Sequence, residues 1–152
     1  MCEADSRRHA NVASGPLQCH PLRLHPGDEL YSTLLHYVRA NSLNAAFIMS
    51  CVGSVVSADL RMANAEVIRH LEGHYEIVSL VGTLSGGDGG HLHISLSDEH
   101  GDVIGGHVMG NLVVYTTAEV IIGNVEGVQF SRPEDPETGY DELMIEKAEA
   151  KR

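Results

Sequence analysis

Residues 91–108 place the strongest constraint on the fold of this 152-residue chain, because their pattern is that of a β-hairpin. The stretches HLHISL and VIGGHV are strand-like, and the polar stretch DEHGD lies between them. Alternation of apolar and polar residues, as in HLHISL, is typical of a strand with one buried face. A short loop of this composition joins antiparallel neighbours. The sequence therefore predicts two adjacent antiparallel strands here.

Three histidines lie on this hairpin. His91 and His93 are two residues apart on one strand, so their side chains point to the same face. If Ser97 pairs with Val103, His93 lies directly opposite His107, with the two Cβ atoms about 5 Å apart. Three imidazole nitrogens with an open fourth position are typical of a catalytic zinc site. We therefore predict that the three histidines bind zinc or a related divalent ion.

A second interpretation of the same histidines involves no metal. A slip of one residue in the hairpin register would send His107 to the opposite face of the sheet. In that case the three side chains would be solvated or hydrogen-bonded separately. Glycines at 89–90 and 105–106 favour convergence, since they leave room for a ligand or a neighbouring backbone. The pattern alone leaves both interpretations open.

The remaining segments predict a β-rich domain with one amphipathic helix. Apolar residues recur at helical spacing between an N-cap candidate, Asp28, and Asn41. Segment 45–63 is interpreted as two strands broken at Gly53 and Ser54, and the acidic segment 131–142 as a surface loop. Further strands are predicted at 16–24, 67–73, 75–84, 112–123, 128–130 and 141–147.

Length and charge limit the domain organisation and the partners. We expect a flexible leader over residues 1–15, one domain over 16–146 and a solvated tail over 147–152. The formal net charge of −11 repels phosphate backbones, so direct binding to nucleic acid is not expected. The three cysteines have no C-x-x-C spacing and no apolar run could span a membrane, which predicts a soluble cytoplasmic protein.

Two charged residues occur in apolar, strand-like surroundings, where an unpaired charge is costly. Arg61 lies in ADLRMA and Glu76 in HYEIV. As catalytic residues, Arg61 would hold an anionic substrate and Glu76 would act as a base beside a metal-bound water. The alternative is an ion pair at a subunit interface. Cys51, in an apolar strand, is expected to be inert.

Residues 72–123 resemble the signature of the PPC domain, a module of plants and prokaryotes. LRLHPGDEL and AAFIMSCVGSVVSADLRMA extend the resemblance over nearly all of 16–146. It implies an α+β fold with a mostly antiparallel sheet, and homotrimers packed through that sheet. Plant members carry this module in nuclear proteins beside AT-hooks with an Arg-Gly-Arg core, which makes the nucleus the alternative location. This chain has no such core.

The PPC fold is also similar to that of acetolactate decarboxylase, a zinc enzyme. Its His-x-His pair and later third histidine correspond in pattern to His91, His93 and His107. Two functions from different classes follow. The first is a homotrimeric zinc protein that acts on a small molecule, with Arg61 and Glu76 assisting. The alternative is a non-catalytic trimeric interaction module, related to the DNA-associated proteins but without their AT-hook.

Overall fold

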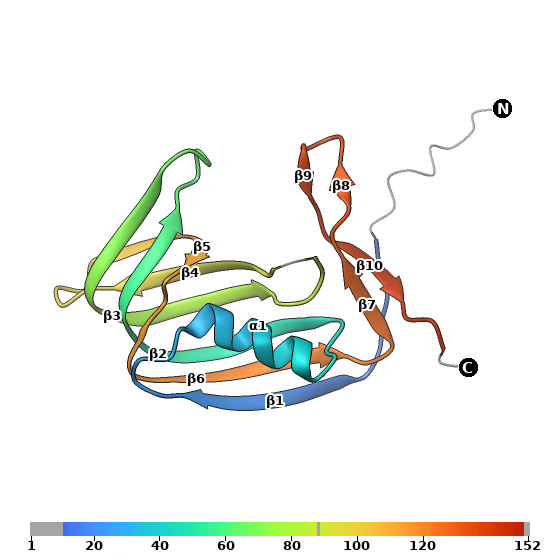
Figure 1. Ribbon diagram of the computed structural model, residues 1–152, viewed down its shortest axis with the longest axis horizontal. Helices are drawn as coiled ribbons and strands as arrows, with labels where there is room; N and C mark the ends of the chain where they lie inside the picture. Colours follow the sequence, from blue (N-terminus) through green and yellow to red (C-terminus); the bar gives the residue numbers. More distant parts are fainter. Residues whose placement is uncertain (1–10, 88, 151–152) are drawn as a thin grey trace.

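The computed structural model describes residues 11–87 and 89–150, so residues 1–10 of the predicted leader and 151–152 of the predicted tail lie outside it. Six strands form the main sheet: β1 Leu17–Leu24, β2 Ala46–Arg61, β3 Ile68–Thr83, β4 His91–Ser97, β5 Val103–Gly110 and β6 Val114–Val125. One helix and four short strands complete the described residues: α1 Leu30–Ala40, β7 Val128–Ser131, β8 Glu134–Asp135, β9 Tyr140–Asp141 and β10 Met144–Lys147. This architecture confirms the predicted mostly antiparallel sheet with a single helix (Figure 1).

The strand order of the main sheet is β1-β6-β2-β3-β4-β5, and every pairing is antiparallel. β5 also pairs with the end of β2, so β2, β3, β4 and β5 close on themselves. This closure leaves the β4–β5 hairpin without a free edge near its histidines, because His107 pairs with Arg61 on one side and with His93 on the other. The hairpin is therefore held on both flanks.

The long strands correct two sequence predictions. Segment 45–63 is not broken at Gly53, since β2 runs unbroken from Ala46 to Arg61. Gly53 instead lies at a register shift against β6, where a Cβ atom would overlap the carbonyl oxygen of Thr117. Likewise 67–73 and 75–84 form one strand, β3, with an irregularity at Gly73. The glycines therefore mark bulges and close approaches between strands.

The helix forms where its apolar spacing predicts, but its N-cap is Glu29 rather than Asp28. The Glu29 carboxylate accepts hydrogen bonds from the backbone N–H groups of Tyr31 and Ser32, and also from Leu112 N at 2.8 Å. Asp28 accepts from His25 N in the preceding turn. Glu29 therefore both caps α1 and ties it to the β5–β6 connection. The helix buries its apolar face in the core: Leu30, Leu34, Leu35 and Val38.

The C-terminal segment is more ordered than the surface loop predicted for 131–142. β8 and β9 pair as a small hairpin, and β10 pairs with β7. Figure 1 shows this hairpin standing at one end of the sheet, while the turn between β2 and β3 rises at the other end. No helix in the described residues is long and apolar enough to cross a membrane.

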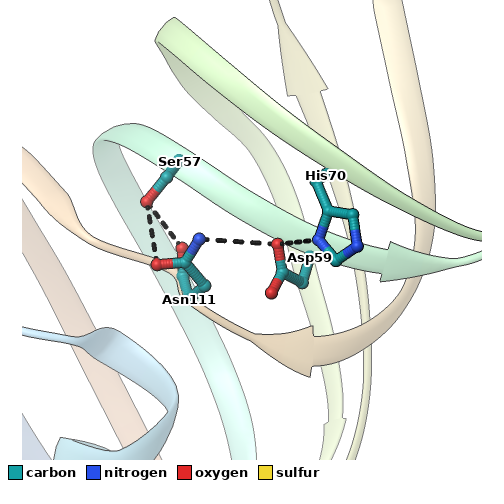
Figure 2. Close-up of polar contacts among 4 residues, drawn as sticks. All are labelled: Ser57, Asp59, His70 and Asn111. Carbon is teal, nitrogen blue, oxygen red and sulfur yellow. Dashed lines mark hydrogen bonds and ion pairs between the residues drawn. The ribbon is translucent and has the colours of Figure 1, made fainter.

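A polar network fixes the end of β2 to its neighbours (Figure 2). Asp59 accepts hydrogen bonds from Asn111 Nδ2 at 3.4 Å and, on the other side, lies 2.8 Å from His70 Nδ1. Ser57 donates to the carbonyl oxygen of Asn111 at 2.7 Å. Asn111 has a left-handed backbone, with φ of 54°, which asparagine tolerates better than most residues. The network therefore anchors the turn that follows β5.

Candidate metal centre

The register of the β4–β5 hairpin is the predicted one. Ser97 pairs with Val103, and His93 pairs with His107. Leu92, which alternates with the two histidines of β4, is buried in the core, so His91 and His93 point away from it on the outer face. The alternative one-residue slip is excluded by this pairing. All three histidines consequently lie on one face of the sheet.

The imidazoles converge closely enough to share one ion. One ring nitrogen from each of the three histidines lies within 4.8 Å of the other two. The Nε2 atoms of His91 and His93 are 3.3 Å apart. Two nitrogens that bind one tetrahedral zinc ion at about 2.0–2.1 Å are themselves about 3.3 Å apart. No other group of three potential metal ligands in the described residues meets the same spacing.

The surroundings of His91 and His107 favour the uncharged form of these two side chains. Burial, followed by the charge of Arg61 and the other two histidines, lowers the pKa of His107 to about 4. Burial and then the charge of Arg132 lower the pKa of His91, although Glu142 opposes this shift. A lowered pKa means that the neutral form dominates at neutral pH, and the neutral imidazole is the form that binds a metal. Protons therefore compete weakly for His107.

Glycines around the hairpin allow neighbouring backbones to approach the histidines. A Cβ atom on Gly90 would lie 2.6 Å from the carbonyl oxygen of Thr83. One on Gly105 would lie 2.7 Å from that of Ile94. These glycines therefore leave room for the backbone of a neighbouring strand, as the sequence predicted, because any side chain would overlap a carbonyl oxygen of that strand.

The structure separates the two predicted charged residues. Arg61 pairs with His107 and lines the same pockets as the histidines. Glu76 pairs with Ser97, at the opposite end of β4 from His91, and its side chain is exposed. His93, the nearer histidine of β4, is four residues from Ser97, which corresponds to about 13 Å of extended strand. Glu76 is therefore too far from the cluster to act as its base.

Two further charged residues, which the sequence pattern did not indicate, lie beside the histidine cluster. Arg132 follows β7 and Glu142 follows β9, and both line pockets that include His91. One feature of the sequence distinguishes Arg132, since it is the only basic residue in the acidic segment 131–142. Nothing in the local pattern indicates which strand that segment faces.

An open pocket of about 550 Å³ lies against the cluster. Its lining comes from the β2–β3 turn, the end of β2, the start of β4, β5 and the β8–β9 region. A pocket of this size accommodates a small molecule. Its lining residues include His91, His107, Arg61, Arg132 and Glu142.

A closed group of antiparallel strands with an outward-facing histidine triad beside a pocket defines a small β-rich domain with a potential metal-binding site. The chain belongs to the Plants and Prokaryotes Conserved (PCC) domain family, whose model matches residues 12–126. This match confirms the resemblance to the PPC domain that the sequence indicated. The likeness to acetolactate decarboxylase stays a prediction.

Individual relatives agree with this assignment. A hypothetical protein from Salmonella enterica is 41% identical, with a TM-score of 0.85 over 89% of this chain and 97% of that one. A metal-containing protein from Archaeoglobus fulgidus is 28% identical, with a TM-score of 0.72 over 84% and 93%. The bifunctional protein GlmU of a Synechococcus strain is 41% identical over 95% of this chain but only 23% of its own length. The chain thus spans less than a quarter of the GlmU proteins that it matches.

Proposed function

We propose that this protein binds one divalent metal ion, zinc, through His91, His93 and His107, with the open coordination position facing the pocket for a small molecule. The observation that carries the proposal is the convergence of three imidazole nitrogens within 4.8 Å of one another, with those of His91 and His93 at the spacing of a tetrahedral zinc ion. The metal content of the related Archaeoglobus fulgidus protein supports it.

The surroundings of the site favour a reactive role over a purely structural one. Structural zinc sites are closed by four protein ligands, whereas this group offers three and borders an open pocket. A bound ion would supply Lewis acidity, polarising a carbonyl group or activating water. Arg61 is placed to orient a ligand, and Glu142, rather than the distant Glu76, is the carboxylate placed to handle a proton.

The alternative function is a non-catalytic trimeric interaction module. It would leave the histidines without a metal and would use the outer surface of the sheet to recruit proteins. The net charge of −11 makes direct contact with DNA unfavourable in either case. Metal content therefore separates the two functions.

Purified protein without a histidine tag is expected to contain about one divalent ion per chain, because three imidazoles with matched spacing bind zinc tightly. Elemental analysis by inductively coupled plasma mass spectrometry measures this ratio. Titration of metal-free protein with zinc should saturate at the same stoichiometry. A protein that stays metal-free after exposure to zinc would favour the interaction module.

The outer face of the sheet is the basis for a proposed homotrimer. In β6, Ala118, Val120 and Ile122 are buried, so Ile121 points to the opposite face of the sheet. Val52, opposite Glu119, shares that outer face and is 55% exposed. Other apolar side chains of β2 and β3 are exposed as well: Met49, Val78 and Val81. Apolar surface of this extent is typical of an interface, and the PPC resemblance implies three copies.

Light scattering is expected to give about three times the 16.4 kDa mass of one chain. Val52→Glu should lower that mass, since it places a charge in the apolar face. Val67→Glu is the matched control, because Val67 is 46% exposed but lies beside the β2–β3 turn. A monomeric wild-type protein would contradict the trimer, and equal masses for the two variants would contradict the assignment of this face as its interface.

A further inference from the structure

Two arginines from distant parts of the sequence lie beside the histidine cluster. Arg61 ends β2 next to His107, and Arg132 follows β7. Both line the pocket of about 550 Å³, together with His91. The charge of each lowers the pKa of His91, so both guanidinium groups act electrostatically on the cluster. The pocket therefore has two cationic groups in its lining.

Arg132 has hydrogen-bonding capacity that the protein does not use. Its Nη2 atom donates to Thr83 Oγ1 at 2.9 Å. Its Nε atom is buried and has no hydrogen-bond partner. A buried donor without a partner is costly, and such groups in native structures usually have a ligand or water partner. Within the described residues, the Arg132 guanidinium group therefore uses one of its donors only, the one that bonds to Thr83.

Neither guanidinium group has a carboxylate partner in the part of the chain that the structure describes. Among the described residues, no Asp or Glu oxygen lies within 4.0 Å of Arg61 or Arg132. The side chain of Arg61 makes no hydrogen bond within that part of the chain. An arginine fork in a pocket without a carboxylate partner has the geometry that recognises an oxyanion.

Two carboxylates also line the pocket, and they limit its net charge. Asp141 is exposed, and Glu142 accepts a hydrogen bond from Thr138 Oγ1 at 2.9 Å. The two carboxylates balance the two guanidinium groups in the pocket lining. A divalent ion on the histidines would then leave the pocket positively charged. That charge would attract an anion despite the acidic character of the whole chain.

We propose that this pocket binds a small oxyanion, a molecule with a carboxylate or phosphate group, held between Arg61 and Arg132. Any contribution of a bound metal to the affinity for the oxyanion rests on the proposed function. The contacts with the two arginines do not depend on it. An oxyanion oxygen would accept a hydrogen bond from the Nη atoms of Arg132, and Arg61 would hold the other side of the ligand. The ligand class is therefore anionic.

The proposed oxyanion subsite includes a residue from outside the region that the family model matches. The family model ends at residue 126, whereas Arg132 lies beyond it. The histidines and Arg61 come from within the matched region. The metal cluster therefore lies within the matched region, whereas the oxyanion subsite also needs Arg132 from beyond it, and Arg132 can be tested separately from the cluster.

Isothermal titration calorimetry on zinc-loaded and zinc-free protein tests the proposal, with oxalate as the carboxylate probe and inorganic phosphate as the other. Arg132→Gln and Arg61→Gln should each raise the dissociation constant of the preferred probe at least about tenfold, because each loses a charged hydrogen bond. Arg23→Gln is the matched control, since Arg23 lies on β1 and bonds to Thr117. Circular dichroism verifies the fold of each variant.

The outcomes separate this proposal from the metal site. Arginine-dependent binding in zinc-free protein supports the oxyanion subsite even if zinc is never bound. Wild-type protein that binds neither probe, or pocket variants that bind both probes as tightly as the Arg23→Gln control, would overturn it. Zinc content, measured in the same samples, should not change in Arg132→Gln.

Discussion

Replacing His93 by alanine is expected to remove the metal from the protein and to leave its fold intact. His93 supplies one of three converging nitrogens, and two imidazoles do not hold zinc against competing buffer. Affinity should fall by more than about 100-fold, since even the loss of an outer hydrogen-bond partner costs about 10–100-fold. The side chain is exposed on the outer face, so its removal leaves no cavity in the core. Elemental analysis and circular dichroism measure the two effects.

His100→Ala is the matched control for this loss of metal. His100 lies in the loop of the same hairpin, and its side chain is 75% exposed. The control variant should retain about one ion per chain. Equal metal content in wild-type protein and His93→Ala would show that the three histidines are not a metal site, whatever their spacing.

Gly82→Ala is expected to be the most destabilising single methyl addition near the site. Gly82 has φ of 131°, and a Cβ atom there would overlap the carbonyl oxygen of His91. Backbone strain costs about 1–3 kcal/mol, and displacement of β4 adds to it, so we expect a loss of about 3 kcal/mol or more. In a chain of this size that corresponds to about 6–12 °C in Tm. Zinc affinity should fall as well, because His91 moves with β4.

Gly110→Ala separates strain from overlap. Gly110 has φ of 140°, close to that of Gly82, but no atom lies within 4 Å of the position its Cβ would take. This control should lose only the strain contribution and should bind zinc normally. Calorimetric unfolding of the two variants gives the difference. Equal losses of stability would show that the contact between β3 and β4 is looser than its geometry indicates.

The part of the site that the sequence predicts is the part built from one local segment. The five-residue loop from Asp98 to Asp102 leaves little freedom in the register of the hairpin, and the buried face of β4 specifies the same register. A slip would have exposed Leu92, Ile94 and Leu96 to water. The convergence of His91, His93 and His107 therefore follows from local chemistry.

The errors concern features that depend on distant segments. Gly53 looks like a break in the sequence, but in the fold it allows β6 to approach closely. Glu76 is surrounded by apolar residues along the chain, yet its side chain points to solvent at the other end of β4. Arg132 reaches the site only through the pairing of β7 with β10 and the hairpin between them. No local pattern encodes such placements.

The polar network at the end of β2 has a consequence for the order in which the chain can assemble. All three candidate metal donors lie on one hairpin, whose contacts are close in sequence and form early on the folding timescale. Arg61 is distant in sequence from His107 and contacts the hairpin only when the end of β2 pairs with β5. The hydrogen bonds of Asp59 with His70 and Asn111 stabilise this pairing. The hairpin alone therefore carries all three candidate donors, whereas Arg61 joins them only once β2 and β5 have paired. If the proposed metal site and ligand pocket exist, the donors of the metal can come together before the lining of the pocket is complete.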